Sequence, residues 1–549
     1  MKAVFIPLLI LLITVPTQAQ EPAPQRVGVS QTSRRLELRE AIEKALAANL
    51  EIEIERTNTE LARQAVKIAQ AYTDTIFRWQ PVLETLTVPT SSVLIGAEGR
   101  QSEHRFAQDF HVLQKLPNWG TQLSLDFENN RLSTNNPFVS LNPFFNTRLF
   151  FNLNQPMLRN FLIDPERAQL QIRRKQLNIS ETEFELRAID IITRVEEAYW
   201  DLLAARQDVD VKADAVQWAR EQLGRTQRMI DAGTLAPVEL AAAEAELERR
   251  RDTWFASVGL LTEAENRLKA LLAPNRQDEL WQQEVIPVTE KTYEGPETED
   301  LPQAVGLALD QRPELRVVRL RQEANTIQKQ LERDQTKPQL DLVASYGNTG
   351  LGGTLLEREN PFSSANVLLY GRLNQLSAAA GLPPLLPPSF GSVPEFLVGG
   401  YGTSLSNLFS GRFQTAQVGL SLDLNLRNRA AEARLAQTLV TEKQLKLEQD
   451  RIEQVVEAQL RNAIQAIQTA RQRIAAAEAS VKAAKEKFDS EIRLFQTGES
   501  TNFLVLTRQN EFSDSRLRQV IANLDYNKAV SRLEQALGST FKTHQIILK

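Results

Sequence analysis

The sequence predicts a mainly α-helical protein that also contains β-strands, and it predicts that several copies assemble into a tube. Three observations support this fold class: two helical runs too long for an ordinary core, short segments that alternate apolar and polar residues, and an order of segments that occurs twice. The chain of 549 residues is 42% hydrophobic and 24% charged, as in ordinary folded proteins. Because the composition is ordinary, the long helices and the strands must be explained by how they pack against one another.

The first residues have the layout of a secretory signal peptide. Lys2 precedes the apolar run "AVFIPLLILLITV", and "TQA" ends at Ala19 with small residues that suit cleavage. We expect a signal peptide at 1–19 and a linker at 20–37. A membrane anchor is the alternative, but this run is shorter than the roughly 20 residues that a spanning helix needs. The chain has no cysteine, which excludes disulfides, thiolate metal sites and a lipoprotein anchor.

Two blocks of the chain follow one plan. The block "LREAIEKALAANLEI" from Leu38 matches "LPQAVGLALDQRPEL" from Leu301 at an offset of 263 (301 − 38). Each block leads to a polar helix, alternating segments, a very long helix, a Gly turn and a shorter helix. An ordered series at nearly constant offset indicates an internal duplication. We expect repeat 1 at 38–274 and repeat 2 at 301–538, with a linker or equatorial segment at 275–300 between them and a C-terminal tail at 539–549.

Each repeat contains a long helical hairpin. In repeat 1, Asp164 is a good N-cap and Pro165 suits the first helical position. The helical pattern runs to about Asp231, which at ~1.5 Å per residue gives a rod about 100 Å long. Apolar residues recur every seven positions along it, which favours coiled-coil packing. We expect helical hairpins at about 164–272 and about 428–537.

The strand segments alternate between an apolar and a polar face. The expected strands lie at about 81–156 in repeat 1, and at about 338–346 and 413–426 in repeat 2. Segments of about ten residues with this pattern fit a transmembrane β-barrel with lipid outside and water inside. A soluble, half-buried sheet has the same period and stays open as an alternative.

Two stretches do not fit two strands per repeat. The region 81–116 holds more strand-like sequence than needed, so it contains either an additional hairpin or a surface loop. The region 347–412 is rich in Gly and Pro ("GLPPLLPPSFGSVP") and is expected to be a long loop at the outer face, acting as a plug or lid.

The number of clear strands points to an oligomer. Four strands from one chain cannot close a pore, because small barrels need about eight. Several copies must therefore contribute, and their helices then have partners for lengthwise packing. From the residues alone we expect a homo-oligomeric tube in which a strand barrel is continued by a helical barrel.

Composition and motifs exclude several classes of function. The net charge of −5 gives no basic surface for nucleic acid. His104, His111 and His544 are the only histidines, and they lack metal-ligand spacing. The nucleophile-elbow and phosphate-loop patterns are absent, and no pair of carboxylates stands out as catalytic. We expect no enzyme activity, no cofactor or metal site and no nucleic-acid partner.

With these features in place, the chain resembles the TolC-like outer-membrane efflux proteins, or outer-membrane factors. The resemblance covers nearly the whole mature chain. It rests on the duplicated plan, "QRPEL" at Gln311, "NQPML" at Asn154, and the turns "DAGTLAPVEL" and "QTGESTNFLVL". It implies a homotrimer in the outer membrane of a Gram-negative-type bacterium, in which a twelve-stranded barrel in lipid continues as a coiled-coil α-barrel through the periplasm.

The resemblance also implies a function and partners. The chain would be the passive exit duct of a tripartite efflux or type I secretion system. It would receive substrate from an inner-membrane pump of the RND or ABC type through a periplasmic membrane-fusion adaptor. The alternative class is an exported periplasmic coiled-coil scaffold without a pore. A simple porin is a third option, but it does not need helical rods of this length.

Both Gly turns would then be hairpin tips that dock the adaptor. Gly suits the left-handed position that ends a helix. The docking candidates, three at each turn, are Gly233, Thr234, Leu235, Gly498, Glu499 and Ser500.

The resemblance also implies an acidic ring at the periplasmic end, and this chain departs from it. The matching positions in repeat 2 are Leu504 and Thr507, which are not acidic. Glu239 in repeat 1 is the better acidic candidate for a periplasmic aperture. A plain helix cap for the glycines and a solvated surface charge for Glu239 remain the simpler alternatives.

Overall fold

The computed structural model describes residues 26–30, 32–91, 99–289, 300–356, 361–386 and 392–546. The expected signal peptide at 1–19 lies outside these residues. The chain forms two compact units. Unit 1 comprises Met1–Glu60, Ile179–Arg319 and Leu447–Lys549, and unit 2 comprises Leu61–Asn178 and Leu320–Lys446.

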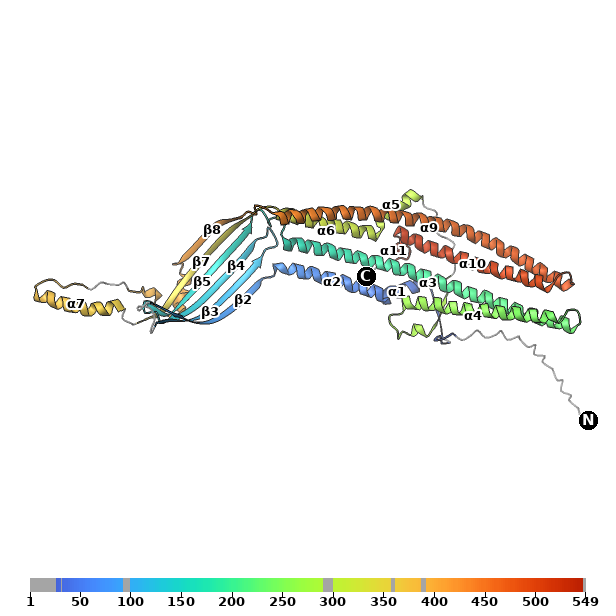
Figure 1. Cartoon of the computed structure of the whole chain (residues 1–549), viewed down its shortest axis with the longest axis horizontal. Helices are drawn as coiled ribbons and strands as arrows, with labels where there is room; N and C mark the ends of the chain where they lie inside the picture. Colours follow the sequence, from blue (N-terminus) through green and yellow to red (C-terminus); the bar gives the residue numbers. More distant parts are fainter. Residues whose placement is uncertain are drawn as a thin grey trace, which may run out of the picture. The chain divides into compact units, whose positions relative to one another are not determined.

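The same series of helices occurs in both halves of the chain (Figure 1). The first half contains α1 (Leu38–Ala48), α2 (Leu50–Gln70), α3 (Pro165–Asp231) and α4 (Val238–Leu272). The second half contains α5 (Leu301–Gln311), α6 (Pro313–Gln335), α9 (Arg429–Thr497) and α10 (Asn502–Leu537). Corresponding helices begin at a nearly constant offset, as the first residues of α1 and α5 (301 − 38) and of α3 and α9 (429 − 165) show.

The long helices start and run as their sequences favour. Helix α3 has 67 residues and α9 has 69. The Asp164 carboxylate accepts a hydrogen bond from the backbone N–H of Arg167 at 2.7 Å, which confirms it as the N-cap. At ~1.5 Å per residue each helix is a rod about 100 Å long. No helix in the described part of the chain combines the length and apolar character needed to cross a membrane.

The core of unit 1 joins helices of both repeats to the segments that flank repeat 1. One buried cluster brings together α1, α3, α4 and the parallel strands β1 (Ser33–Leu36) and β6 (Glu284–Pro287). Tyr199 is fully buried there, and its hydroxyl lies 3.0 Å from the Leu36 carbonyl oxygen and accepts from the Thr289 N–H at 2.9 Å. A second cluster joins α5, α9 and α10. The segments on either side of repeat 1, represented by Leu36 and Thr289, are therefore both hydrogen-bonded to Tyr199 of α3.

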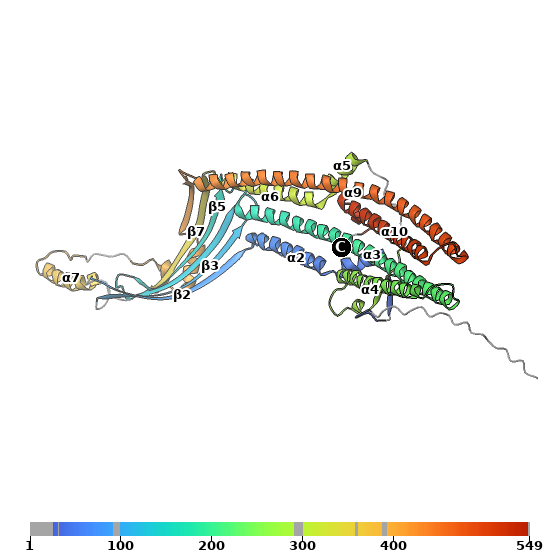
Figure 2. The same cartoon turned by 45° about the vertical axis from the view of Figure 1, so that its right-hand side comes forward.

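Unit 2 contains one antiparallel sheet of six strands in the order β2-β3-β4-β5-β7-β8 (Figure 1). Its strands are β2 (Ile76–Pro89), β3 (Arg100–Lys115), β4 (Gln122–Thr134), β5 (Leu141–Pro156), β7 (Gln339–Leu355) and β8 (Gln414–Asp423). The expectation of four strands per chain is therefore wrong, because the stretch 81–116 is an additional hairpin and not a surface loop. Figure 2 shows that the strands curve along their length.

The expected loop at 347–412 is also wrong in part. Strand β7 continues to Leu355, and the connection contains α7 (Pro361–Ala379), the short helix η3 (Glu395–Leu397) and α8 (Tyr401–Phe409). Helix α8 packs on the sheet over Gly350 and Gly352. A Cβ atom at Gly350 would lie only 2.0 Å from the Ser404 carbonyl oxygen, so glycine is required for this close approach. Gly350 and Gly352, at the start of the expected loop, thus belong to a strand under a helix.

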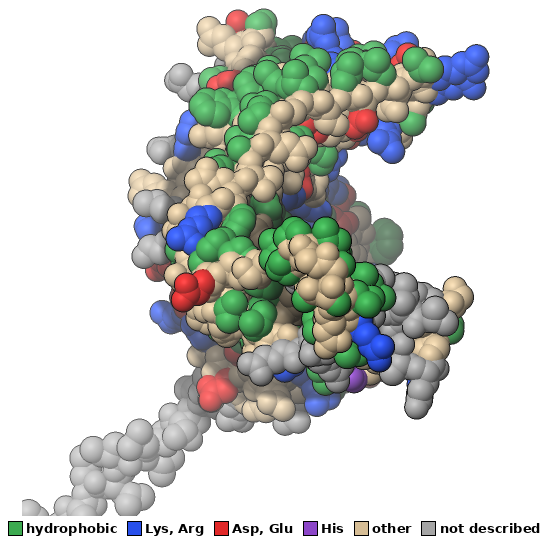
Figure 3. Space-filling view, turned by 90° about the vertical axis from the view of Figure 1, so that its left-hand side faces the viewer, with side chains coloured by type: hydrophobic (Ala, Val, Ile, Leu, Met, Phe, Trp, Pro, Cys, Tyr) green, Lys and Arg blue, Asp and Glu red, His purple; other side chains and the backbone are tan. Residues whose placement is uncertain are grey.

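Helix α7 presents a largely uncharged surface. Several of its apolar side chains are exposed, including Leu368 at 78% and Leu376 at 67%. Figure 3, which looks at the α7 end, shows hydrophobic and other uncharged side chains with charged groups scattered among them.

Candidate functional site

Two turns between long helices are the first candidate surface. In the turn from α3 to α4, Gly233 has φ +73° and its N–H donates to the Ile230 carbonyl at 2.8 Å. The Thr234 N–H donates to the Met229 carbonyl at 2.9 Å. This pair of bonds closes a helix with a left-handed residue, so the role of Gly233 as a helix terminator is confirmed.

The turn from α9 to α10 repeats this geometry. Gly498 has φ +82°, its N–H donates to the Phe495 carbonyl at 3.2 Å, and the Glu499 N–H donates to the Leu494 carbonyl at 2.9 Å. Among the described residues, no atom lies within 4 Å of a Cβ built at either glycine. Backbone conformation, and not crowding, therefore requires glycine at Gly233 and Gly498.

Each turn also carries an exposed apolar side chain that was not expected from the sequence. Val238 is 72% exposed at the start of α4, and Phe503 is 75% exposed in the first turn of α10. Their offset in the sequence (503 − 238) equals the one that relates Gly233 to Gly498 (498 − 233). The available signal was an apolar residue at matching positions just after both turns. Single exposed apolar side chains are common on protein surfaces, so the notable feature here is their repetition at equivalent positions of both turns.

The aperture candidates lie in the first two turns of the returning helices. Glu239 is half-buried in the first turn of α4, where its charge suits the helix N-terminus. Leu504 is 37% exposed on α10. The Thr507 hydroxyl donates to the Phe503 carbonyl at 2.8 Å, so it is satisfied within its own helix. These placements leave Glu239 as the one acidic group among the three.

The two hairpins are tied together near their turns within unit 1. The Gln222 side chain on α3 donates to the Asn502 carboxamide oxygen at 2.6 Å, and both side chains are buried. Further from the turn, the Arg250 guanidinium of α4 donates to the Asn510 side chain at 2.9 Å. Trp218 of α3 lies 5.8 Å from the ring of Phe512 on α10. Polar and aromatic contacts thus hold hairpin against hairpin.

A row of ion pairs continues this contact along α3 and α10. Asp214 pairs with Arg516 at 2.7 Å, and Asp201 pairs with Lys528 at 2.5 Å. All four side chains are partly exposed, so each pair contributes about 1 kcal/mol or less to stability. The ion pairs therefore contribute little to the stability of the contact between α3 and α10, and their main effect is to set how the two helices are aligned.

The sheet is the second candidate surface because its two faces differ in polarity. One cross-strand row runs through all six strands and is wholly apolar: Phe77, Val112, Leu125, Phe151, Tyr346 and Ala416. A row on the opposite face is wholly polar: Gln80, Asp109, Glu128, Arg148 and Thr349. The apolar row is not covered in the described chain, since Phe151 is 46% and Tyr346 is 51% exposed.

The polar face also carries hydrogen-bonded networks. The Asp126 carboxylate lies 2.8 Å from His111 Nδ1 and accepts from the Asn152 side chain at 2.6 Å and the Ser124 hydroxyl at 2.8 Å. Arg148 lies 3.6 Å from Glu128. Of the two histidines in β3, His111 thus lies on the polar face, and His104, at an even spacing from Val112, lies on the opposite face.

Helix α8 covers the same face of the sheet as the apolar row. Thr147 lies opposite Gly350 in the register, and Phe151 is four positions further along the same strand, so both point to one face. The Thr147 hydroxyl is 2.9 Å from the Ser404 hydroxyl of α8, and both residues are fully buried. Asn407 donates to the Leu351 carbonyl at 2.8 Å. Helix α8 is therefore fixed to the apolar side.

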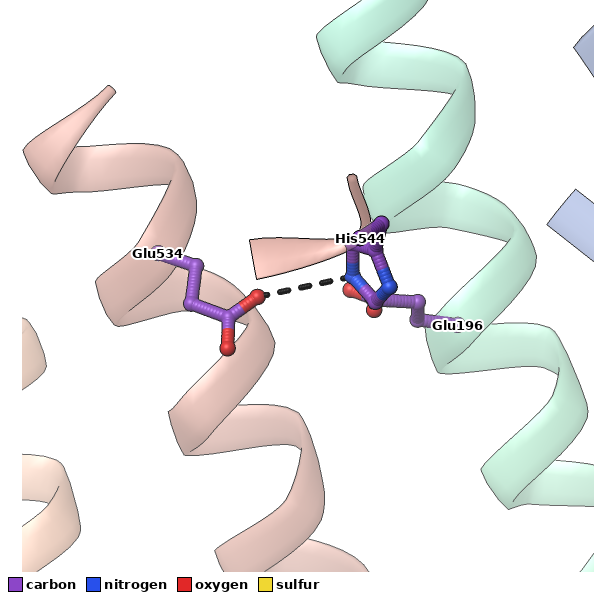
Figure 4. Close-up of side chains that lie close together, drawn as sticks. All are labelled: Glu196, Glu534 and His544. Atoms are coloured by element: carbon purple, nitrogen blue, oxygen red, sulfur yellow. Dashed lines mark ion pairs between the residues drawn. The ribbon is translucent and has the colours of Figure 1, made fainter. Parts of the chain in front are cut away.

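A third group of side chains was not expected from the sequence. Glu196 of α3, Glu534 of α10 and His544, which follows α11 (Thr540–Thr543), converge in unit 1 (Figure 4). Burial alone would lower the pKa of His544, but the neighbouring Glu196 and Glu534 carboxylates raise it to about 9. Burial raises the pKa of Glu534. Because Glu196 belongs to repeat 1 and Glu534 to repeat 2, spacing in the sequence gave no sign of this group.

Comparison with known proteins identifies related sequences and folds. The sequence pattern of a family described as outer membrane efflux protein matches residues 145–273 and 392–539, just over half of the chain. No curated protein matches the chain. The Campylobacter jejuni CmeC outer membrane channel is 14% identical and has a TM-score of 0.60, with 91% of this chain and 85% of that chain covered.

Two further solved structures share the fold. A membrane protein from Pseudomonas aeruginosa is 14% identical with a TM-score of 0.60, covering 95% of this chain and 96% of that chain. The outer membrane protein VceC from Vibrio cholerae is 15% identical with a TM-score of 0.59, covering 91% of this chain and 96% of that chain. At these identities, likeness to solved structures supports the fold alone.

Proposed function

Because this chain belongs to the outer membrane efflux protein family, we propose that it is the outer-membrane exit duct of a tripartite efflux or type I secretion system. In this role it conducts substrate passively from an inner-membrane pump, of the RND or ABC type, through a periplasmic adaptor. It lies in the outer membrane of a Gram-negative-type bacterium with a large periplasmic portion. The observation that carries the proposal is the six-stranded sheet with one exposed apolar face and one polar face.

The sheet supports a barrel made from several copies. Strands β2 and β8 end the sheet, and each pairs with one neighbour only in the described chain. Open edges of this kind favour pairing with another strand. In a ring of copies, β2 of one chain pairs with β8 of the next, the apolar face meets lipid and the polar face lines water. Three copies with six strands each give eighteen strands, which replaces the expected twelve.

The position of α8 bears on the expected plug or lid. Since α8 lies on the apolar face, it sits outside such a barrel and leaves the lumen free. The α8 part of 347–412 is then a buttress on the outer side and not a plug.

The hairpin turns support a docking role. Exposed Val238 and Phe503 stand beside Gly233 and Gly498, so each turn offers an apolar contact on a rigid helix end. The adaptor then binds at Gly233, Thr234 and Leu235, and at Gly498, Glu499 and Ser500 of repeat 2. Opening at the periplasmic end separates hairpins joined by the Gln222–Asn502 contact. A partner opens it only by binding the open arrangement more tightly.

The test is to express the full-length chain, separate the two membranes, and run the outer-membrane fraction unheated in mild detergent. An SDS-resistant trimer that dissociates on heating supports the duct. A soluble periplasmic species contradicts it and favours the coiled-coil scaffold.

A pair of variants tests which face meets lipid. Leu125→Lys places a charge on the apolar face and should cost about 2–4 kcal/mol of barrel stability near the bilayer centre. Gln80→Lys places the same charge on the polar face and should assemble normally. Equal behaviour of the two variants would contradict the assignment of the faces.

A further inference from the structure

The convergence of Glu196, Glu534 and His544 has the composition of a metal site. Each residue offers one ligand atom, and the three atoms lie within 4.8 Å of one another. Figure 4 shows the two carboxyl groups directed toward the imidazole from α3 on one side and α10 on the other. Imidazole nitrogens and carboxylate oxygens are both Zn²⁺ ligands, and a zinc ion with three protein ligands often adds a water.

Two buried atoms in this group lack a hydrogen bond within the described part of the chain. Glu196 is 3% exposed, and its Oε2 has no hydrogen-bond partner among the described residues. His544 Nε2 lies 2.7 Å from Glu196 Oε1, but the contact does not have the alignment of a hydrogen bond, and Nε2 is also unsatisfied there. Buried polar atoms are nearly always partnered, so the unpartnered Glu196 Oε2 is the position at which a cation would bind beside the imidazole.

Distance and charge both fit a divalent ion. His544 Nε2 and Glu534 Oε2 are 3.6 Å apart, close to the separation of two ligands that each lie about 2.1 Å from one tetrahedral ion. Two carboxylates with a neutral imidazole carry a charge of −2, which a divalent cation neutralises.

The neighbouring packing places His544 for this role. Helix α10 ends at Gly538 with φ +73°, and α11 turns the chain back. Phe541 and Ile546 pack against the buried cluster around Tyr199. The tail is thus held beside α3 by apolar contacts on both sides of His544.

We propose that Glu196, Glu534 and His544 bind a divalent cation of the Zn²⁺ type, which fastens the C-terminal segment to α3 of repeat 1 and α10 of repeat 2. The site is structural, since each ligand comes from a different segment and the ion joins all three. It is independent of substrate conduction and of the identity of the pump.

The test uses the full chain in detergent, purified without a polyhistidine tag and stripped with EDTA. Zn²⁺ is titrated by calorimetry, and Co²⁺ is added to follow its visible absorption bands. We expect one ion per chain, with Co²⁺ bands of a nitrogen- and oxygen-ligated site. His544→Ala should weaken Zn²⁺ binding at least about tenfold, since even the loss of an outer-shell partner costs about 10–100-fold. His104→Ala and His111→Ala are matched controls that should bind as the parent does.

Glu534→Gln is the second variant, because it keeps the shape of the side chain and the apolar docking of the tail. It should also lose at least about tenfold in Zn²⁺ affinity while its circular dichroism stays that of the parent. The absence of saturable binding, or binding unchanged in Glu534→Gln, would overturn the proposal and leave the group as an ion-paired triad. Loss of binding in a sheet-histidine control instead would place the ion elsewhere and overturn it too.

Discussion

The two repeats differ most between their first helix pair and their long helix. Strand β2 begins at Ile76 and β7 begins at Gln339, at the same offset as α1 and α5 (339 − 76), so the two strands occupy the same place in their repeats. Repeat 1 then adds the strands β3 and β4 before β5. Repeat 2 adds the helices α7 and α8 before β8, over a similar length of chain. One inherited plan has thus been extended in two different ways.

The local sequences explain the different outcomes. Strands β3 and β4 alternate apolar and polar residues, so they extend a sheet whose faces must stay apolar and polar. The α7 segment instead has the run Val367, Leu368 and Leu369 followed by Leu373 and Leu376, a helical spacing. The spacing of apolar residues in each insert therefore determines whether it forms strands or helices, while the flanking strands keep their register.

The largest expected effect comes from making repeat 1 resemble repeat 2. Replacing residues 90–140 with a tight turn removes β3 and β4 and lets β2 pair directly with antiparallel β5, as β7 pairs with β8. Because barrel diameter grows roughly linearly with strand number, a trimer should shrink from eighteen strands to twelve, to about two thirds of its width. Electron microscopy of the trimer measures this. An unchanged width would show that β3 and β4 lie outside the barrel wall.

The next effect tests the helix that only repeat 2 carries. Gly350→Ala forces a Cβ atom against the α8 backbone and should destabilise this packing by about 2–3 kcal/mol. Limited proteolysis at 395–409 should then become faster. Gly419→Ala on the neighbouring strand is the matched control, because no described atom lies within 4 Å of its Cβ. If both variants resist proteolysis alike, α8 is not held by this close contact.

A smaller effect distinguishes the two hairpin turns. Asn502→Ala removes the buried partner of Gln222 and should cost about 1–2 kcal/mol, because the Gln222 amide is left without its acceptor. The counterpart in repeat 1, at the offset that relates Gly498 to Gly233, is Pro237, whose side chain cannot hydrogen-bond. Pro237→Ala should therefore leave the contact intact. Thermal unfolding followed by circular dichroism measures the cost, and bilayer conductance reports opening, which should increase for Asn502→Ala alone.

The smallest effect concerns Glu51 and its counterpart Glu314. The hydrogen bond from Arg194 lowers the pKa of Glu51 below its ordinary value, and the charge of Arg187 acts in the same direction. The pair therefore stabilises the fold above the ordinary pKa of Glu, and this contribution is lost as the pH falls below it. Glu51→Gln should cost less than about 1 kcal/mol at pH 7, since the side chain is partly exposed and screened.

Urea unfolding at two pH values checks the sign. The difference between the parent and Glu51→Gln should be present at pH 7 and should shrink as the pH falls below the ordinary pKa of Glu. Glu314→Gln, in which the ion pair with Arg312 at 2.8 Å is lost, is the repeat 2 control. A difference that grows toward low pH would contradict the assigned direction.

Sequence reasoning succeeded where the signal is local or periodic. The N-cap at Asp164 and the left-handed turns at Gly233 and Gly498 depend on residues close in the chain, and each is confirmed. It failed where a partner lies far away. Gly350 reads as a loop residue unless Ser404 is known to pack over it. The neighbours of His544 likewise cannot be recognised from the sequence, because only the packing of α3 and α10 brings Glu196 and Glu534 beside it.

The Gln222–Asn502 contact has a consequence for symmetry. The duplication gives each chain two hairpins of the same geometry, so a ring of three chains presents six hairpin ends. Since only repeat 2 carries Asn502 at its turn, these ends are of two kinds that alternate around the ring. In the proposed trimer the symmetry of the ring would therefore be threefold and not sixfold, and a surrounding partner would meet two chemically different classes of binding position.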